Sequence, residues 1–300
     1  MKFSIVSDSS CDIPPELIQR WGIHIVPFYV SFDGETYRRE GRDLSAEEVY
    51  QTLVDRPGCY PKTSMPTLYD YGAAFSGPVK KGLPVLCLCL NAAFSGACQT
   101  AANAAALMQE EFPGSKIHVM DSQLVTVLQG LLVHQAVRLR DQDLTLEEAV
   151  PRLEALRETG RIFFTTNDLD YLSHGGRIGK AAAATGTVLQ LKEKEYVRSC
   201  KVDCGLHSAG LVRGRKKSLQ RCLELFREYV EREHIDLSDY TVTTGYGYDH
   251  AEYAAFNEQA AALLRDLGHT WERMGDFHIS VTIGVHTGPH PIGIGLLRRA

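Results

Sequence analysis

A serine between a buried strand and a helix is the residue of this chain best placed to do chemistry. Ser95 follows the apolar run 85–90 and a small-residue turn, and an Ala-rich segment that favours helix begins directly after it. The spacing predicts that Ser95 caps a helix over 96–110. Because a helix N-terminus carries unpaired N–H groups and a partial positive charge, we expect this turn to bind an anion.

Ser95 is also a candidate nucleophile, since Asp121 and His286 follow it in the chain order of α/β-hydrolase triads. The nucleophile elbow of those enzymes carries G-x-S-x-G, whereas Ala93 and Ala97 stand at the two glycine positions here. The residues alone leave two hypotheses open: a capping serine without a catalytic role, and an autonomous serine esterase.

Two residues farther along the chain could bind an anion together. Arg177 lies in a Gly-rich turn and His286 opens a His-Thr-Gly-Pro turn, and arginine offers a rigid fork to phosphate or carboxylate. A P-loop is not indicated, because the motif needs glycine where His174 stands and Ser or Thr where Ala181 stands. Taken singly, each residue is better explained as a surface charge or a loop-bracing side chain.

The eight cysteines do not form a disulfide framework or a recognisable metal motif. Cys200, Cys204 and His207 have a spacing suggestive of a metal site, but no C-x₂-C pair accompanies them, so we expect no metal. Cys87 and Cys89 alternate in an apolar run and are predicted to share one face of a strand. Free thiols in a reducing compartment are the preferred interpretation.

Composition limits the classes of function. The net charge of −5 does not support a broad nucleic-acid-binding surface. The chain has no run of about 18 apolar residues, and its start does not have the pattern of a signal peptide, so we predict a cytoplasmic protein without an integral membrane segment. The length of 300 residues suggests two domains.

Alternating strands and helices predict a parallel-sheet α/β domain over residues 1–160. Strands are expected over 2–7, 23–30, 84–90 and 116–120, with a small hairpin excursion near 31–40. Capping boxes predict helix starts after Ser45 and Thr145. Asp12 is expected to cap a short helix opened by two prolines, and Thr67 to cap a helix that follows the loop 60–67.

Residues 161–300 predict a second domain of α+β type. A strand over 161–166, irregular strands within 188–212 and a strand over 240–245 are combined with long helices over 213–234 and 250–266. The β-branched stretch 278–285 predicts a further strand, followed by a loop over 286–291 and a short terminal strand.

Several blocks of sequence together resemble the DegV family. They occur in the family's order over nearly the whole chain: IVSDSSCDIPPEL, PKTSMPT, LNAAFSGACQTA, VMDSQ, LDYLSHGGRIGKAAAATGTVLQLK, VRGRKKSL and IGVHTGPHPIGIGL. The resemblance implies a two-domain α/β protein that binds one long-chain fatty acid, such as palmitate, stearate or oleate, between its domains. Many family members are the binding subunit of a bacterial fatty acid kinase. They present the carboxylate to a separate ATP-binding kinase subunit, and the acyl phosphate formed enters phospholipid synthesis.

The resemblance also implies roles for individual residues. Thr63 and Ser95 match residues that hold the carboxylate by their hydroxyls, with Ser64 and the amide of Gly96 nearby. Arg177 and His286 match residues at the mouth of the site that are implicated in kinase docking and phosphoryl transfer. No catalytic residue, metal or cofactor is implied for this subunit. A lipid carrier or sensor without a kinase partner stays open as an alternative.

Overall fold

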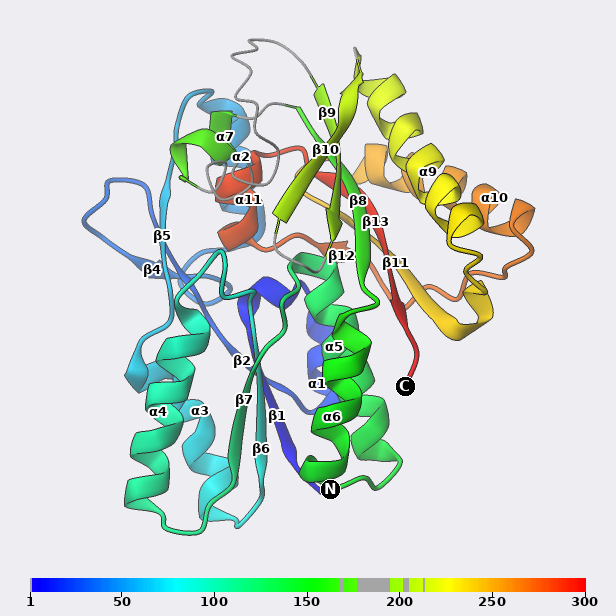
Figure 1. Cartoon of the computed structure of the whole chain (residues 1–300). Helices are drawn as coiled ribbons and strands as arrows, with labels where there is room; N and C mark the ends of the chain where they lie inside the picture. Colours follow the sequence, from blue (N-terminus) through cyan, green and yellow to red (C-terminus); the bar gives the residue numbers. More distant parts are fainter. Residues whose placement is uncertain (1, 168–169, 177–194, 202–204, 213) are drawn as a thin grey trace.

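The strands of the chain form three sheets in the residues that the structure describes. In this computed structural model, those residues are 2–167, 170–176, 195–201, 205–212 and 214–300 (Figure 1). The N-terminal sheet is parallel and has the order β2-β1-β6-β7. Its strands are β1 (Ser4–Asp8), β2 (His24–Val26), β6 (Val85–Cys89) and β7 (Ile117–Asp121).

Helices cover both faces of this parallel sheet. They are α1 (Pro15–Trp21), α3 (Leu68–Lys80), α4 (Ala97–Glu111), α5 (Thr126–Asp141) and α6 (Leu146–Arg157). Cys87 and Cys89 pack toward α3 and α4, whereas Leu86 and Leu88 pack toward α1 and α5. The predicted common face of the two cysteines is therefore confirmed, with 3.7 Å between their sulfur atoms. A strand covered on both faces reads as a continuous apolar run, as β6 does.

The N-terminal region also contains a small antiparallel sheet, in the part of the chain where a hairpin near 31–40 was expected. It has the order β4-β3-β5 and contains β3 (Tyr29–Ser31), β4 (Arg38–Arg39) and β5 (Lys62–Ser64), with α2 (Ala46–Asp55) between β4 and β5. The prediction of one strand over 23–30 is wrong, because β2 and β3 belong to different sheets. Pro27 and Phe28 separate them, and proline has no N–H to donate to a continuing ladder. The predicted loop 60–67 contains β5.

The C-terminal sheet is mixed and has the order β10-β9-β8-β13-β11-β12. Its strands are β8 (Arg161–Thr166), β9 (Glu195–Lys201), β10 (Gly205–Val212), β11 (Tyr240–Tyr246), β12 (Phe277–His278) and β13 (Ile292–Arg298). The other elements of this region are α7 (Asp170–His174), α9 (Arg215–Arg232), η2 (Leu237–Asp239), α10 (His250–Asp266) and α11 (Val281–Thr287). The fold is thus α/β with a parallel-sheet domain and a separate α+β region, as predicted.

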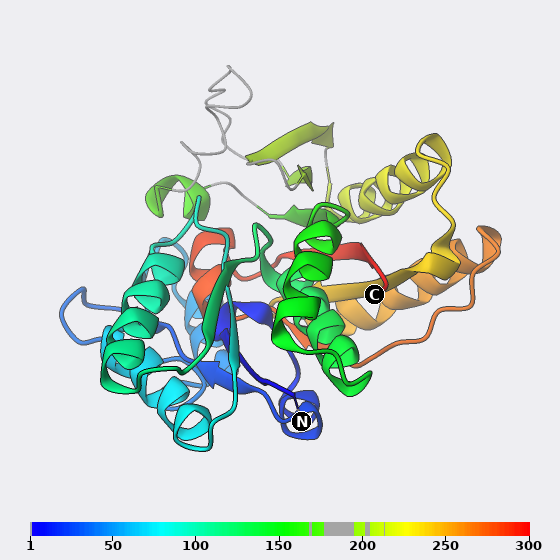
Figure 2. The ribbon, with the colours of Figure 1, turned by 60° about the horizontal axis from the view of Figure 1, so that its bottom comes forward.

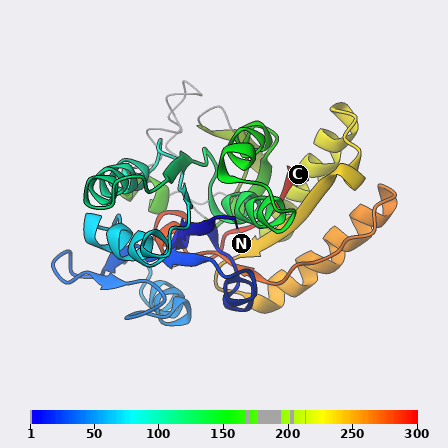
Figure 3. The same ribbon diagram turned by 90° about the horizontal axis from the view of Figure 1, so that it is seen from below.

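One helix pair lies between the two large sheets. Helix α5 contacts β1 and β6 of the parallel sheet and also β11 and β13 of the C-terminal sheet, and α6 packs beside it. Figures 2 and 3 show this pair in green, between the α3–α4 layer and the α9–α10 layer. The main hydrophobic cluster runs through α5 to Phe277 and Leu297. The division that we propose near residue 160 therefore separates two sheets that share one core.

The predicted strand over 278–285 is wrong. Only Phe277 and His278 pair as a strand, and residues 281–287 form the helix α11. The β-branched residues favour a strand, but tertiary contacts described below decide for the helix. The seven residues of β13 that follow are central in the sheet rather than a short terminal strand.

Helix caps also test the sequence interpretation. The capping boxes at Ser45 and Thr145 are present, and Thr67 caps α3. The predictions for Asp12 and Ser95 are wrong. Pro14 is the N-cap of α1, and Gly96 is the N-cap of α4.

Two predictions made from composition, free thiols and no membrane-spanning segment, can be compared with the described residues. Cys11, Cys59, Cys87, Cys89, Cys98 and Cys222 are free thiols. In the described part of the chain, no helix is both long and apolar enough to cross a membrane.

Candidate functional site

An apolar cavity of about 640 Å³ lies between the parallel-sheet region and the C-terminal sheet. This volume is within the usual range for small-molecule sites, about 300–1,000 Å³. Its apolar wall comes from both regions of the chain: Phe28, Met65, Leu90, Ala92, Phe94, Val125, Val127, Ile162, Phe164, Leu172, Gly245, Ile279, Ile283, Pro291 and Gly293. A long apolar molecule would thus be enclosed by two sheets at once.

The polar lining contains every predicted carboxylate-binding residue. Thr63, Ser64, Ser95 and Gly96 all line the cavity, and so does His286. The Oγ1 atom of Thr63 lies 3.0 Å from Nε2 of His286, a hydrogen bond between residues 223 positions apart in the sequence. The fold therefore brings together the small sheet, the start of α4 and the end of α11 at one end of the cavity.

Backbone pairing positions the two hydroxyls of β5. Thr63 pairs with Val30 and Ser64 with Tyr29 in the antiparallel β3–β5 ladder. The next residue, Met65, reaches across to the start of α4, where a Cβ at Gly96 would lie only 2.9 Å from its Sδ atom. The absence of a side chain at Gly96 thus allows the segment after β5 to approach α4 closely.

The turn before α4 is closed by Asn91. Its side-chain oxygen accepts from the amide of Ala93 at 2.8 Å, and its backbone oxygen accepts from the amides of Phe94 and Ser95. These bonds place Ser95 one position before the N-cap, where its Oγ accepts from the amide of Ala97 at 3.1 Å. Ser95 therefore contributes a hydrogen bond to the helix start without being the N-cap. The N-cap is Gly96, which has no side chain to cap the helix.

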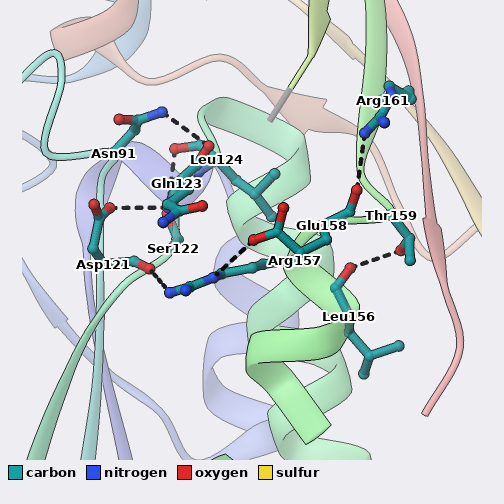
Figure 4. Close-up of polar contacts among 10 residues, drawn as sticks. All are labelled: Asn91, Asp121, Ser122, Gln123, Leu124, Leu156, Arg157, Glu158, Thr159 and Arg161. Atoms are coloured by element: carbon teal, nitrogen blue, oxygen red, sulfur yellow. Dashed lines mark hydrogen bonds and ion pairs between the residues drawn. The ribbon is translucent and has the colours of Figure 1, made fainter. Parts of the chain in front are cut away.

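The loop between β7 and α5 is hydrogen-bonded to this turn (Figure 4). The side-chain amide of Asn91 donates to the backbone oxygen of Gln123 at 2.9 Å. Oδ1 of Asp121 accepts from the amides of Ala92 and Gln123, at 3.1 and 2.9 Å. Arg157 of α6 donates to the backbone oxygen of Asp121 at 2.9 Å. The serine turn is consequently fixed to the loop between β7 and α5.

These contacts bear on the esterase alternative. A serine hydrolase needs a histidine between its serine and its acid. Here Nε2 of His286 is paired with Thr63, and Oδ1 of Asp121 accepts two backbone amides. The hydrogen bonds found for Ser95, Asp121 and His286 therefore do not make the relay that the esterase requires, and the geometry does not favour it.

Exposure to solvent differs between the two ends of the cavity. Ser64 and Gly96 are exposed at the polar end, and Met65 retains 44% of its surface exposed. Val127, Gly245 and Ile279 are buried at the other end, where a Cβ at Gly245 would lie 2.6 Å from Val127 and 3.5 Å from Ile279. The cavity therefore opens at its hydroxyl groups and closes at apolar side chains.

Two buried carboxylates lie directly behind the cavity wall. Asp12 accepts from the hydroxyl of Thr126, and Glu40 accepts from the hydroxyl of Thr282 at 2.8 Å; both threonines line the cavity. Burial raises the pKa of Asp12 to about 7 and also raises the pKa of Glu40, because desolvation outweighs the hydrogen bonds that favour the charged forms. These buried carboxylates therefore fix two threonine side chains of the cavity wall by hydrogen bonds.

Some predicted positions cannot be placed in this way. Arg177 lies outside the described residues, and so do the side chains of Cys200, Cys204 and His207. Within the described ranges, no group of three or more His, Cys, Asp or Glu residues could hold a metal ion.

Sequence reasoning missed the contribution of α11 and its anchors. Thr282 and Ile283 line the cavity one turn before His286, from a segment that we predicted as a strand. A signal was present: Ser280 precedes the helix, and Gly288, with φ of 80°, follows it. A serine before and a glycine after a segment are typical helix boundary residues.

The fold and the cavity define a class of protein, one with two sheets around an enclosed apolar site that has a hydroxyl-lined mouth. The family model described as "Uncharacterised protein, DegV family" matches residues 2–299, and the chain belongs to this family. A DegV domain-containing protein of Deinococcus radiodurans is 33% identical over 297 residues, which cover 99% of this chain and 98% of the relative.

Two solved structures add ligand information about relatives. A stearic-acid-binding protein from Eubacterium ventriosum is 39% identical, with a TM-score of 0.90 and coverage of 99% of this chain and 98% of that one. A DegV family protein from Thermus thermophilus, described as fatty acid binding, is 29% identical, with a TM-score of 0.83 and coverage of 99% and 100%.

Proposed function

We propose that this protein binds one long-chain fatty acid, with the acyl chain in the cavity and the carboxylate at its open end. The observation that carries the proposal is the combination of an apolar interior with a mouth formed by Thr63, Ser64, Ser95 and Gly96. Each buried methylene contributes about 0.8 kcal/mol, so the chain supplies most of the affinity. Binding of stearic acid by the relative that is 39% identical supports the same ligand class.

The mouth suits a carboxylate better than a neutral head group. Neutral hydroxyls and the N-terminus of the 15-residue helix α4 offer hydrogen bonds and a positive field without burying a full countercharge. We propose that Thr63 and Ser95 donate to the carboxylate, with Ser64 and the Gly96 amide beside them. His286 then serves to orient the Thr63 hydroxyl, to which it is hydrogen-bonded.

We further propose that the bound acid is presented to a separate ATP-binding kinase subunit, which forms an acyl phosphate for phospholipid synthesis. The solvent-exposed mouth supports this role, because a partner's phosphate could reach a carboxylate held there. By family resemblance, His286 and Arg177 are proposed to face the transferred phosphoryl group, since N–H donors and the positive charge of arginine stabilise the negative charge that grows during transfer. A carrier or sensor without a kinase would use the same cavity.

The experiment that tests binding is solvent extraction of the purified protein followed by mass spectrometry. We expect about one fatty acid per chain, and delipidated protein should bind added oleate or palmitate. Recovery of no acid, together with no binding of either added acid, would overturn the proposal.

The kinase step needs a separate measurement. With an ATP-binding kinase subunit from the same cell, His286→Ala should slow acyl-phosphate formation by more than it weakens oleate binding. Equal effects on both would contradict the proposed division between holding the acid and assisting transfer. Formation of no acyl phosphate by wild-type protein would favour the carrier or sensor.

A further inference from the structure

The helix that carries His286 is not capped by the side chain at its own N-cap position. Ser280 occupies that position in α11 but makes no side-chain capping bond. The helix has only seven residues, and isolated helices of that length are not stable in water. Its first amides therefore need acceptors from elsewhere in the fold.

Two carboxylates from the N-terminal region supply those acceptors. Oδ1 of Asp12 accepts from the amide of Ser280 at 2.8 Å. Oε1 of Glu40 accepts from the amide of Val281 and, at 3.4 Å, from the amide of Thr282. Three consecutive amides at the start of α11 thus meet acids that are distant in sequence. Negative charge at this end is also favoured by the helix dipole.

Glu40 is itself held on its other side. Its Oε2 atom accepts from the hydroxyls of Ser9 and Thr282, each at 2.8 Å. The Glu40 backbone amide donates to the backbone oxygen of Phe28 at 2.9 Å, and the Phe28 amide donates to Oγ of Ser9 at 3.1 Å. The glutamate is 8% exposed, so solvent does not compete strongly for these bonds. One carboxylate therefore joins η1 (Ser9–Cys11), the small sheet and α11.

Helix α11 is packed closely against its neighbours. It lies beside α2 and α7 (Figure 1), and a Cβ at Gly284 would lie 2.4 Å from the hydroxyl of Tyr50. That hydroxyl donates to the backbone oxygen of Ile279 at 2.9 Å. From Val281 to His286 the helix rises only about 8 Å, so a shift at its start is passed to the histidine.

We infer that Glu40, supported by Asp12, is a positioning residue that holds α11 so that His286 meets Thr63 at the mouth of the cavity. The inference deepens the proposed function and rests on it for the effect on fatty acid binding. Its geometric part, the placement of His286, stands on the contacts of the protein alone.

The test compares Glu40→Ala and Glu40→Gln with wild type by two measurements. The first is the ¹⁵N chemical shift of the His286 ring in histidine-labelled protein, assigned with His286→Ala; Thr63→Val gives the value without the hydrogen bond. The second is the Kd for oleate. Glu40→Ala should move the His286 signal to the Thr63→Val value and weaken oleate about tenfold, the loss expected for one hydrogen bond.

Glu40→Gln is the conservative rescue, since its amide oxygen can still accept from the helix and its NH₂ can donate to a hydroxyl. It should keep the His286 signal near wild type and the Kd within about threefold, because the helix acceptor is retained. Ser9→Ala, a milder change, should shift the signal in the same direction by less, and it keeps the inference testable where Glu40→Ala does not fold.

Thr244→Val is the matched control for lost stability. Thr244 is buried on β11, and its hydroxyl donates to Asn257 at 2.6 Å. It is adjacent to Gly245, which lines the cavity, but its own side chain points to the opposite face of the strand and is not part of the lining. This variant should lower the urea midpoint and leave the His286 signal unchanged. An unmoved signal and unchanged Kd in folded Glu40→Ala would overturn the inference, as would an unmoved signal in Ser9→Ala where Glu40→Ala does not fold. Wild-type protein that yields no extracted acid and binds neither oleate nor palmitate would overturn the proposed function, while the His286 signal would still test the geometry.

Discussion

Replacing Asp12 by asparagine should change how stability depends on pH. Burial raises the pKa of Asp12 to about 7 in the folded protein, against 3.8 for an unperturbed aspartate. Between these values the folded state keeps a proton that the unfolded state has released. Asp12 therefore contributes stability that is fully present below about pH 4 and is lost as the pH rises through 7. Asparagine resembles the protonated acid at every pH and removes this dependence.

The magnitude follows from the raised pKa. One pH unit between the two pKa values changes the free energy of unfolding by at most about 1.4 kcal/mol. Between pH 5 and pH 8, Asp12→Asn should thus gain about 3 kcal/mol relative to wild type. The introduced amide oxygen can still accept from the Ser280 amide, and the Thr126 hydroxyl can rotate to accept from the new NH₂ group, so the variant is expected to fold.

Urea unfolding of both proteins at pH 5, 6, 7 and 8 measures the effect. The quantity to compare is the difference in unfolding free energy between Asp12→Asn and wild type at each pH. Burial lowers the pKa of His134 to about 4, so this histidine makes the stability of both proteins rise with pH, and the subtraction removes that contribution. Asp33→Asn is the control. Hydrogen bonds from the amides of Glu35 and Thr36 lower the pKa of this exposed acid, so its contribution to stability is lost only below the range measured, and its difference from wild type should stay constant from pH 5 to 8. A difference between Asp12→Asn and wild type that stays constant from pH 5 to 8 would refute the reasoning.

Three further predictions concern single sites. Ser95→Ala should raise the Kd for oleate about tenfold in a calorimetric titration, and an unchanged Kd would contradict its contact with the carboxylate. Thr165→Val should raise the free energy of unfolding by about 1 kcal/mol in urea, because the buried Thr165 hydroxyl lacks a hydrogen-bond partner among the described residues; a loss of stability would contradict this. Gly130→Ala should destabilise the protein by about 3 kcal/mol, because the new Cβ would lie 2.4 Å from the backbone oxygen of Cys11. Gly72→Ala, in the helix α3 with open space around its Cβ, should stabilise the protein by about 1 kcal/mol. Equal effects of the two changes on thermal unfolding would refute the steric argument.

Local signals in the sequence were sufficient for most of the parallel-sheet region. The apolar run of β6, the capping boxes of Ser45 and Thr145 and the Ala-rich α4 each determine their own element, because the local preference agrees with the tertiary environment. The turn at Ser95 was predicted to bind an anion from its place between a strand and a helix, whereas its carboxylate role and those of Thr63, Ser64 and Gly96 came from family resemblance. The cavity that these residues line could not be read from spacing.

The errors occur where distant residues decide the local structure. Asp12 looks like the cap of the helix after it, but the left-handed conformation of Asp12, with φ of 54°, directs its carboxylate to Thr126 and Ser280 instead. The stretch 278–285 has strand-forming residues, yet Asp12 and Glu40 accept its amides and Gly284 admits Tyr50. No periodicity in a single segment reports such contacts, because the partners lie far away in the sequence.

The position of β13 has a consequence for the order in which the protein can fold during synthesis. The strands of the parallel sheet all lie within residues 4–121, so that sheet can assemble early on the ribosome. In the second sheet, β8 and β11 pair with β13 and not with each other, so its middle stays open until residues 292–298 have been made. Such distant pairing is slow because a long loop must close first. Until then the nascent chain exposes the apolar faces that later surround the cavity, and chaperones that bind apolar segments would act in this interval.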